Sequence, residues 1–560
     1  MSRNGFLAVV VGCALTLGLL VEMPQWLYRM HPLSLGFPVE LNSDEDLYLS
    51  RVTEALEGRA NLAAEGITGD PEILPLQSAL IEEWEGRLFS WTGLSASELF
   101  QVMDFVAPFL VFLLLVTFFL QAGFSRWAAL SGAIIFSLLE LYNLNRPIHQ
   151  RESFLLTLGA IVLLVEGVSG RRLLGVLGGA LLGLLVGVYF WSWTFAWTWA
   201  GILFLWVSIQ WAWDRRHTHL SLPQRFLLFF GRSRPPFLLV DWQWLLLFLV
   251  LGVLTAVPFI IDLLEGMAHP LMSAVQPRLE FIPSRAPESW IRTSLFTLQL
   301  VGLVGAFARS QPLRKKYQLV LVTLLAAYIV FHQQVVHGVT FLFSSHYLFA
   351  LVLAGVVTFL VSILHMRESK WLFLSFAGSA LFLGGIAYDA RYVINHFRID
   401  EGRYTEQHLA SILPELHAMQ RTTILSDIDT MKFVASHTKH DVPYSPRLNY
   451  MLITDEELAE RYCLSKVPLP PQTWDIEGET VLLYDPDVTK LDPAKRAYEI
   501  ELVQETCKQM SIDPVPVLER YGVEYILWDA RRQQLWNVKR FKARLGEVKR
   551  DTEWILYKIL

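Results

Sequence analysis

The sequence predicts an all-α polytopic membrane domain followed by a folded, water-exposed C-terminal α/β domain. Of 560 residues, 53% are hydrophobic and only 18% are charged, whereas soluble chains carry about 25% charged residues. The apolar residues gather in runs of about twenty, which is long enough for a helix to cross the ~30 Å hydrocarbon layer. The tail is richer in charge and in turn-forming prolines. We therefore expect a membrane domain over 1–391 and a second domain over 392–560.

The apolar runs predict about eleven transmembrane helices. The first run continues past Cys13 without a small-residue cleavage site, so we interpret it as a retained span and not as a removed signal peptide. The Gly- and Trp-rich stretch 172–213 allows a different division, which would change the count by one or two. The expected spans are 5–24, 103–121, 126–143, 154–169, 172–190, 193–213, 241–262, 293–308, 317–333, 345–365 and 371–390.

Loop charges predict the orientation of these spans. Cytoplasmic loops carry an excess of Lys and Arg, and Arg171, Arg172 and the Arg314–Lys316 run fall on one side if the N-terminus is cytoplasmic. A large, acid-rich first loop, 25–102, and the tail then lie outside the plasma (inner) membrane. The net charge of −6 argues against a nucleic-acid partner.

In the tail, local patterns predict both strands and helices. Residues 480–485 and 523–528 are typical of strands, and 401–420 and 493–510 are typical of helices. Cys463 and Cys507 either form a disulfide in an extracytoplasmic domain or stay as two thiols. The three cysteines of the chain do not have the spacing of a zinc site.

Three adjacent acids, Asp44, Glu45 and Asp46, follow the first span. One interpretation is a capped amphipathic helix on the membrane surface, because Asn42 or Ser43 can cap it and acids favour a first turn. The other is a functional cluster, because adjacent carboxylates repel one another and gain from a cation or from a bound group that supplies protons.

The order of features here resembles the first external loop of GT-C glycosyltransferases: a first span is followed by an acidic pair, then by an aromatic residue and an Arg. That superfamily includes oligosaccharyltransferase catalytic subunits and polyprenyl-phosphate-sugar transferases, and the similar segment here is Asp46–Arg51. The resemblance implies a GT-C-like fold and transfer of a sugar from a polyprenyl-phosphate or -diphosphate donor to an acceptor on the outer face. It implies that an acid of the cluster is catalytic, and we rank Asp46 before Asp44 and Glu45, because Asp46 lies closest to Tyr48 and Arg51.

The second external loop, 143–153, offers candidate ligands for the lipid phosphate. Ionisable groups at the mouth of a membrane bundle are costly without a task or a partner. Arg146 and Arg151 suit a phosphate, since a guanidinium binds it through a two-pronged fork, and His149 lies between them. The alternative is that these side chains anchor to lipid headgroups. Glu152 occupies the place of a second acidic motif in oligosaccharyltransferases, without that motif's paired acids.

Further site residues come from the later loops. By the same resemblance, His346 would hold the lipid phosphate, with a hydrogen-bonded structural histidine as the alternative. Glu280 or Glu288 would supply the acid of a mobile external loop, or would be a surface acid. A divalent cofactor, Mg²⁺ or Mn²⁺, would be held by Asp46, Glu152 and Glu280.

Two other functions compete with sugar transfer: a transporter or flippase of lipid-linked or small polar substrates, and a non-enzymatic envelope assembly protein. A transporter is expected to carry ionisable residues near the midplane, often in repeated halves. The span interiors here hold few charges and the halves are not duplicated. The dense acidic cluster therefore favours the enzyme, while its sugar and its acceptor stay open.

Overall fold

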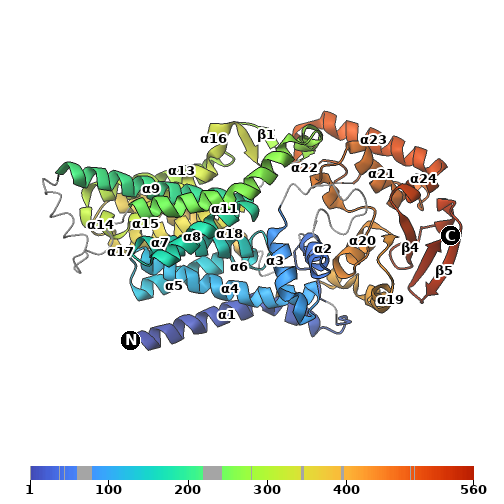
Figure 1. The fold of residues 1–560 in the computed structure, drawn as a ribbon, viewed down its shortest axis with the longest axis horizontal. Coiled ribbons are helices and arrows are strands. Elements are labelled where there is room, and N and C mark those ends of the chain that lie inside the picture. The colour runs from blue at the N-terminus through green and yellow to red at the C-terminus, as the bar shows by residue number, and fades with distance from the viewer. Residues whose placement is uncertain are drawn as a thin grey trace.

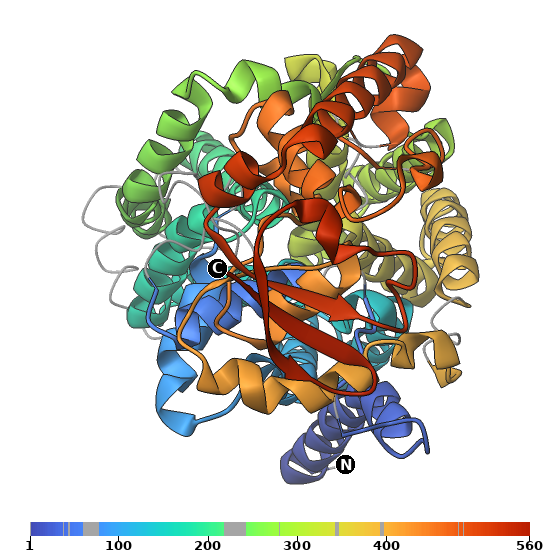
Figure 2. The same cartoon turned by 90° about the vertical axis from the view of Figure 1, so that its right-hand side faces the viewer.

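The computed structural model describes residues 2–36, 38–42, 45–59, 78–217, 242–278, 281–341, 346–391, 397–479, 481–484 and 486–560. Figure 1 shows a bundle of long helices at one end of the molecule and a smaller part of helices and strands at the other. Figure 2 looks onto this smaller part, with its strands in front of the bundle. Each part has its own cluster of buried apolar side chains.

The bundle contains a helix at every predicted span. In chain order these are α1 (Arg3–Arg29), α4 (Ala96–Gln121), α5 (Arg126–Leu139), α7 (Arg151–Val168), α8 (Arg172–Leu184), α9 (Phe190–His217), α11 (Trp242–Ala268), α13 (Trp290–Arg309), α15 (Gln318–Phe331), α17 (Leu348–His365) and α18 (Trp371–Ala390).

Seven helices among the described residues are long and apolar enough to cross a membrane. Three more, α5, α15 and α8 with its continuation η2 (Leu185–Gly187), are apolar but shorter. The seven spans make the chain a multi-pass membrane protein, and the full number of crossings stays a prediction.

Small residues explain why the glycine-rich run lies inside the bundle. Gly175, Gly179 and Gly183 recur every fourth residue and share one face of α8. A Cβ on Gly179 would lie 2.3 Å from the carbonyl oxygen of Phe248 in α11, and one on Gly183 would lie 2.2 Å from that of Gly252. Glycine at these positions lets the two helix backbones approach closely, as in many membrane bundles.

Between α1 and α4 lie α2 (Glu45–Leu56), α3 (Leu80–Phe89) and η1 (Ser90–Thr92). Ten of the twelve residues of α2 are buried, because α3 and α4 cover it on the bundle side and α20 (Ile428–His437) covers it from the C-terminal part. The interpretation of this segment as a helix on the membrane surface is therefore wrong.

The C-terminal part is built on a four-stranded sheet of order β3-β4-β6-β5. β3 (Thr423–Leu425) is parallel to β4 (Val523–Asp529), and β6 (Trp554–Ile559) pairs antiparallel with both β4 and β5 (Leu545–Arg550). Its other helices are α19 (Leu413–Ala418), α21 (Asp455–Lys466), α22 (Pro486–Leu491), α23 (Pro493–Ile512) and α24 (Val515–Arg520), with the 3-10 turns η6 (Glu401–Tyr404), η7 (Gln407–Ile412), η8 (Pro446–Tyr450), η9 (Pro471–Thr473) and η10 (Val538–Phe541).

Two tail predictions are confirmed and two need correction. Strand β4 and helix α23 form where expected. The helix expected over 401–420 is divided into η6, η7 and α19. The strand expected over 480–485 does not form in its described residues, because the backbone N–H groups of Leu483 and Tyr484 donate to the buried Glu499 carboxylate, at 3.0 and 3.1 Å.

The first external loop, the loop between α11 and α13, and the tail meet at one end of the bundle. Thr53 of α2 donates to the carbonyl of Ser436 at 3.0 Å. Arg278, in η3 (Gln276–Arg278), forms a 3.1 Å ion pair with Asp455. The contact between Thr53 and Ser436 agrees with the prediction that the first loop and the tail lie on the same side of the membrane. The remaining short elements are α6 (Leu141–Leu144), α12 (Met272–Val275), β1 (Phe281–Pro283), α14 (Gln311–Lys316), α16 (Gln333–His337) and β2 (Val339–Phe341).

Candidate active site at the junction of the bundle and the C-terminal part

Asp46 lies in the first turn of α2 and is only 3% exposed. Its carboxylate faces the C-terminal part, where it accepts from Arg447 at 3.3 Å and forms an ion pair with Lys432 at 3.4 Å. Its backbone carbonyl accepts from the Ser436 hydroxyl at 3.2 Å. The highest-ranked acid of the sequence prediction is thus buried at the junction and paired with cations that the sequence did not point to. Asp44 lies outside the described residues.

Glu45, the third acid of the cluster, is turned away from these cations. Its carboxylate accepts from the backbone N–H groups of Leu41 and Asn42, at 3.0 and 3.1 Å, and so holds the chain that leads into α2. Burial, followed by the nearby charge of Asp104, raises the pKa of Glu45 to about 8. Burial therefore favours the protonated form of Glu45, and its predicted catalytic role remains untested.

Tyr48 and Arg51, the other residues of the resemblance, face the bundle and α3. The Tyr48 hydroxyl hydrogen-bonds to Nδ1 of His149 at 3.0 Å. The Arg51 guanidinium donates to Glu82 at 3.2 Å, and both side chains are almost completely buried. Since successive residues of a helix point about 100° apart, Asp46 and Tyr48 contact different parts of the molecule. Helix α2 therefore connects the bundle to the tail.

The structure brings two predicted phosphate ligands, His149 and His346, to one place. The ring of His149 stacks on that of Tyr189, with centroids 4.8 Å apart and planes 7° apart. The Tyr189 hydroxyl in turn bonds to Nδ1 of His346. Both histidines line a small cavity of about 10 Å³, together with Ser153 and Ser192, which is room for about one water molecule. Tyr189 was missed by the sequence analysis, because nothing near it in the sequence is charged.

The two arginines of the second loop differ in burial. Arg151 is fully buried and forms ion pairs with Asp104 and, at 2.6 Å, with Glu152. Arg146 is half-buried. The guanidinium of Arg151 is therefore engaged by two carboxylates in this state, and the predicted role of both arginines toward a phosphate is untested.

The predicted metal ligands do not converge in the part of the chain that the structure describes. Glu152 pairs with Arg151 and Asp46 pairs with tail cations, while Glu280 lies outside the described residues. The described residues contain no group of three or more His, Cys, Asp and Glu placed to hold a metal ion. Glu288 is exposed. A divalent cofactor stays a prediction.

Helix α3 contributes two buried acids that sequence reasoning did not select. Glu82 has the Arg51 partner, but neither carboxylate oxygen of Glu85 has a hydrogen-bond partner. Burial, and then the charge of Glu152, raise the pKa of Glu85 well above its ordinary value. An acid with a strongly raised pKa is typical of functional sites and also occurs in structural clusters.

No protein-family model and no curated protein match the chain. Among solved structures, the chain is similar to the crystal structure of ArnT from Cupriavidus metallidurans bound to undecaprenyl phosphate. The superposition covers 100% of this chain and 98% of that chain, with a TM-score of 0.45 and 11% sequence identity. Similarity at this level carries no inference about fold or activity, which rest on this chain's own residues.

Proposed function

We propose that this protein is an integral membrane glycosyltransferase of the GT-C type. It transfers a sugar from a polyprenyl-phosphate or -diphosphate donor to an acceptor on the outer face of the membrane. The observation that carries the proposal is Asp46: the residue that the sequence motif ranks first is buried where the first loop, the bundle and the tail meet, with two cations beside it.

The reaction needs a base and a place for a negatively charged leaving group. The bond between the sugar's anomeric carbon and the phosphate oxygen breaks, a bond to the acceptor oxygen forms, and the acceptor's proton passes to the Asp46 carboxylate. The phosphate leaves with the electron pair of the broken bond, and nearby cations stabilise the charge that develops on it. His149, which hydrogen-bonds to Tyr48 of α2, lines one small cavity together with His346. Their imidazoles would donate hydrogen bonds to the phosphate of the donor.

Purified protein in detergent, supplied with radiolabelled polyprenyl-phosphate sugars and membrane lipid extract, tests the proposal. We expect the wild type to consume the donor and Asp46→Asn to reduce transfer by about 10²–10⁴-fold, the contribution of a general base. Glu57→Gln is the matched control, because Glu57 lies just beyond α2 and is exposed, and it should retain activity.

Further measurements test the other two acids of the cluster, the predicted metal and the flippase alternative. Asp44→Asn and Glu45→Gln test the other two acids, and transfer measured with EDTA and then with added Mg²⁺ or Mn²⁺ tests the metal prediction. If the wild type consumes no lipid-linked sugar, or if all three variants keep full activity, the transferase proposal fails. A lipid-scrambling assay in vesicles would then test the flippase alternative.

A further inference from the structure

The two cations beside Asp46 both come from the C-terminal part, but from different elements. Lys432 lies in α20 and Arg447 lies in η8. Their ends meet on one carboxylate, at 3.4 and 3.3 Å. The hydrogen bonds between Ser436 and α2 hold α20 against the acid. The tail is therefore placed to contribute side chains to the site.

The exposed fraction of the side chain distinguishes Lys432 and Arg447 from the arginines of two other ion pairs, Arg51 and Arg151. The Asp46 side chain is 3% exposed, while those of Lys432 and Arg447 are 29% and 21% exposed. By contrast, Arg51 and Arg151 are 1% and 0% exposed and face carboxylates of the interior. Of these four cations, Lys432 and Arg447 are the two that a ligand can approach from solvent while they still touch the acid.

The charges around Lys432 keep its ammonium group protonated. Burial lowers the pKa of Lys432, but the carboxylates of Asp46 and Asp429 outweigh it, so that the net shift is upward. Asp429 is itself bound by Arg532 at 2.5 Å. A guanidinium and an ammonium that converge from two elements match the oxygens of a phosphate, which both groups bind through charge-assisted hydrogen bonds.

We propose that Lys432 and Arg447 form a phosphate seat, and that Asp46 occupies it while no phosphate is bound. The proposal rests on the proposed function and deepens it. An incoming phosphate takes the two cations from Asp46, and the released carboxylate is then available to accept the acceptor's proton. The acid thus becomes a base only when a phosphate is in place. The phosphate belongs either to the polyprenyl donor or to an acceptor lipid headgroup.

Equilibrium binding tests the seat independently of turnover. The probes are a short polyprenyl monophosphate and the corresponding uncharged polyprenol, titrated into the full-length protein in detergent and followed by calorimetry. We expect Lys432→Gln/Arg447→Gln to weaken binding of the monophosphate by at least about 10-fold and to leave the polyprenol unchanged. Lys508→Gln, which removes an exposed ammonium of α23, is the matched control and should bind both probes like the wild type.

Two further variants separate a phosphate seat from a structural ion pair. Asp46→Asn removes the carboxylate charge that Lys432 and Arg447 share, so this variant should bind the monophosphate several-fold more tightly even though transfer is lost. Lys432→Arg/Arg447→Lys keeps both charges and should recover most of the monophosphate binding. This recovery would show that the loss in Lys432→Gln/Arg447→Gln is due to the missing charges and not to a folding defect. The proposal would be overturned if Lys432→Gln/Arg447→Gln bound the monophosphate as tightly as the wild type, or if Asp46→Asn bound it more weakly.

Steady-state kinetics then identifies the source of the phosphate. The variant for this measurement is Arg447→Gln. If only the KM of the donor rises, the phosphate in the seat is that of the donor, and if only the KM of the acceptor rises, it is that of an acceptor headgroup. Either result supports the seat. A fall in kcat with both KM values unchanged contradicts it. If the monophosphate binds as expected but no sugar is transferred, the proposed function fails and the seat stands.

Discussion

Glu82 and Glu85 lie one turn apart on α3 and are both buried, yet their surroundings differ. Glu82 forms an ion pair with Arg51, whereas Glu85 has no hydrogen-bond partner for either carboxylate oxygen. Removing one member of a buried ion pair leaves an uncompensated charge, while replacing an unpaired buried acid with an apolar side chain removes a desolvation cost. The two residues therefore form a matched pair for substitution.

We expect Glu82→Met to destabilise the protein by about 3–5 kcal/mol, because it leaves Arg51 buried without its partner. Glu85→Met should be neutral or stabilising by about 1–3 kcal/mol, since Met fills a similar volume without burying a carboxyl group that has no hydrogen-bond partner. Thermal unfolding in detergent, followed by intrinsic fluorescence, measures both. Equal destabilisation by the two variants would contradict this account of α3.

The raised pKa of Glu85 also predicts a pH dependence. In the unfolded chain this carboxyl titrates near its ordinary value of 4.5, and in the folded protein it titrates well above that value. The stability that the protonated group contributes is therefore fully present below pH 4.5 and is lost as pH rises through the folded pKa. The stability gain of Glu85→Met over the wild type should grow between pH 5 and pH 8, and a gain that is constant with pH would contradict the assignment.

At the scale of elements, the position of α2 depends on its close contact with α3. Gly86 of α3 allows that contact, because a Cβ there would lie 2.3 Å from the Cβ of Ala55 and 2.8 Å from the backbone nitrogen of Leu56. Backbone atoms cannot move aside as a flexible side chain can. A larger residue at 86 must therefore push α3 away from the helix that carries Asp46.

We expect Gly86→Ala to lower the free energy of unfolding by about 1–3 kcal/mol, the usual cost of overpacking, and to reduce sugar transfer as well. Gly12→Ala is the control, since a Cβ at Gly12 of α1 meets nothing within 4 Å and Ala favours a helix by about 0.5–1 kcal/mol. Thermal unfolding and the transfer assay measure the two effects. A Gly86→Ala variant as stable and active as Gly12→Ala would show that the two helices can separate without consequence.

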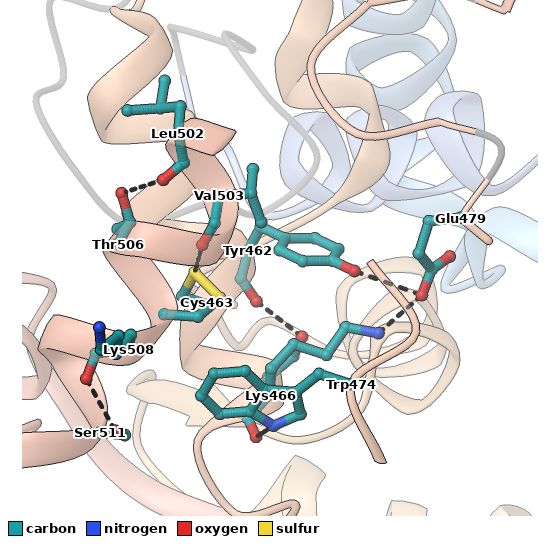
Figure 3. Close-up of a disulfide and its surroundings, with 12 residues drawn as sticks. Tyr462, Cys463, Lys466, Trp474, Glu479, Leu502, Val503, Thr506, Lys508 and Ser511 are labelled. Atoms are coloured by element: carbon teal, nitrogen blue, oxygen red, sulfur yellow. Dashed lines mark hydrogen bonds and ion pairs between the residues drawn. A yellow bond between two sulfur atoms is a disulfide. The ribbon is translucent and has the colours of Figure 1, made fainter. Parts of the chain in front are cut away.

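At the scale of the whole molecule, a disulfide in the tail indicates on which side of the membrane the tail lies. Cys463 of α21 is bonded to Cys507 of α23, and Figure 3 shows the bond between the two helices, with Tyr462 and Lys466 directed toward Glu479. Of the two alternatives that the sequence left open, the structure has the disulfide. Disulfides persist in oxidising compartments, which supports the predicted extracytoplasmic tail.

Removal of this bond should weaken the tail by about 2–4 kcal/mol, because it joins positions 44 residues apart and restricts the unfolded chain. We expect Cys463→Ser/Cys507→Ser to lower the unfolding temperature, and Cys13→Ser, which changes a free thiol, to have little effect. Thiol labelling of denatured protein from cells should modify only Cys13 in the wild type. Labelling of all three cysteines in unreduced samples would contradict both the bond and the extracytoplasmic placement.

The sequence by itself determined the features that neighbouring residues encode. Every predicted span is a helix, because a long apolar run is enough to form a helix in a membrane whatever lies elsewhere in the chain. Strand β4 and helix α23 were predictable from local periodicity in the same way. The short motif that begins at Asp46 was also visible, since its acid, aromatic residue and arginine lie within six residues.

Only the tertiary structure decided what those residues contact. Arg447 is 401 positions from Asp46, so nothing local to either residue could predict their pairing. The local pattern also predicted a strand over 480–485, where the backbone of Leu483 and Tyr484 instead donates to the Glu499 carboxylate. The pattern could not show this, because a side chain distant in the sequence can replace the hydrogen bonds of a sheet. Hydrophobic runs and motifs specify elements, whereas the partners of a buried charge follow from which elements pack together.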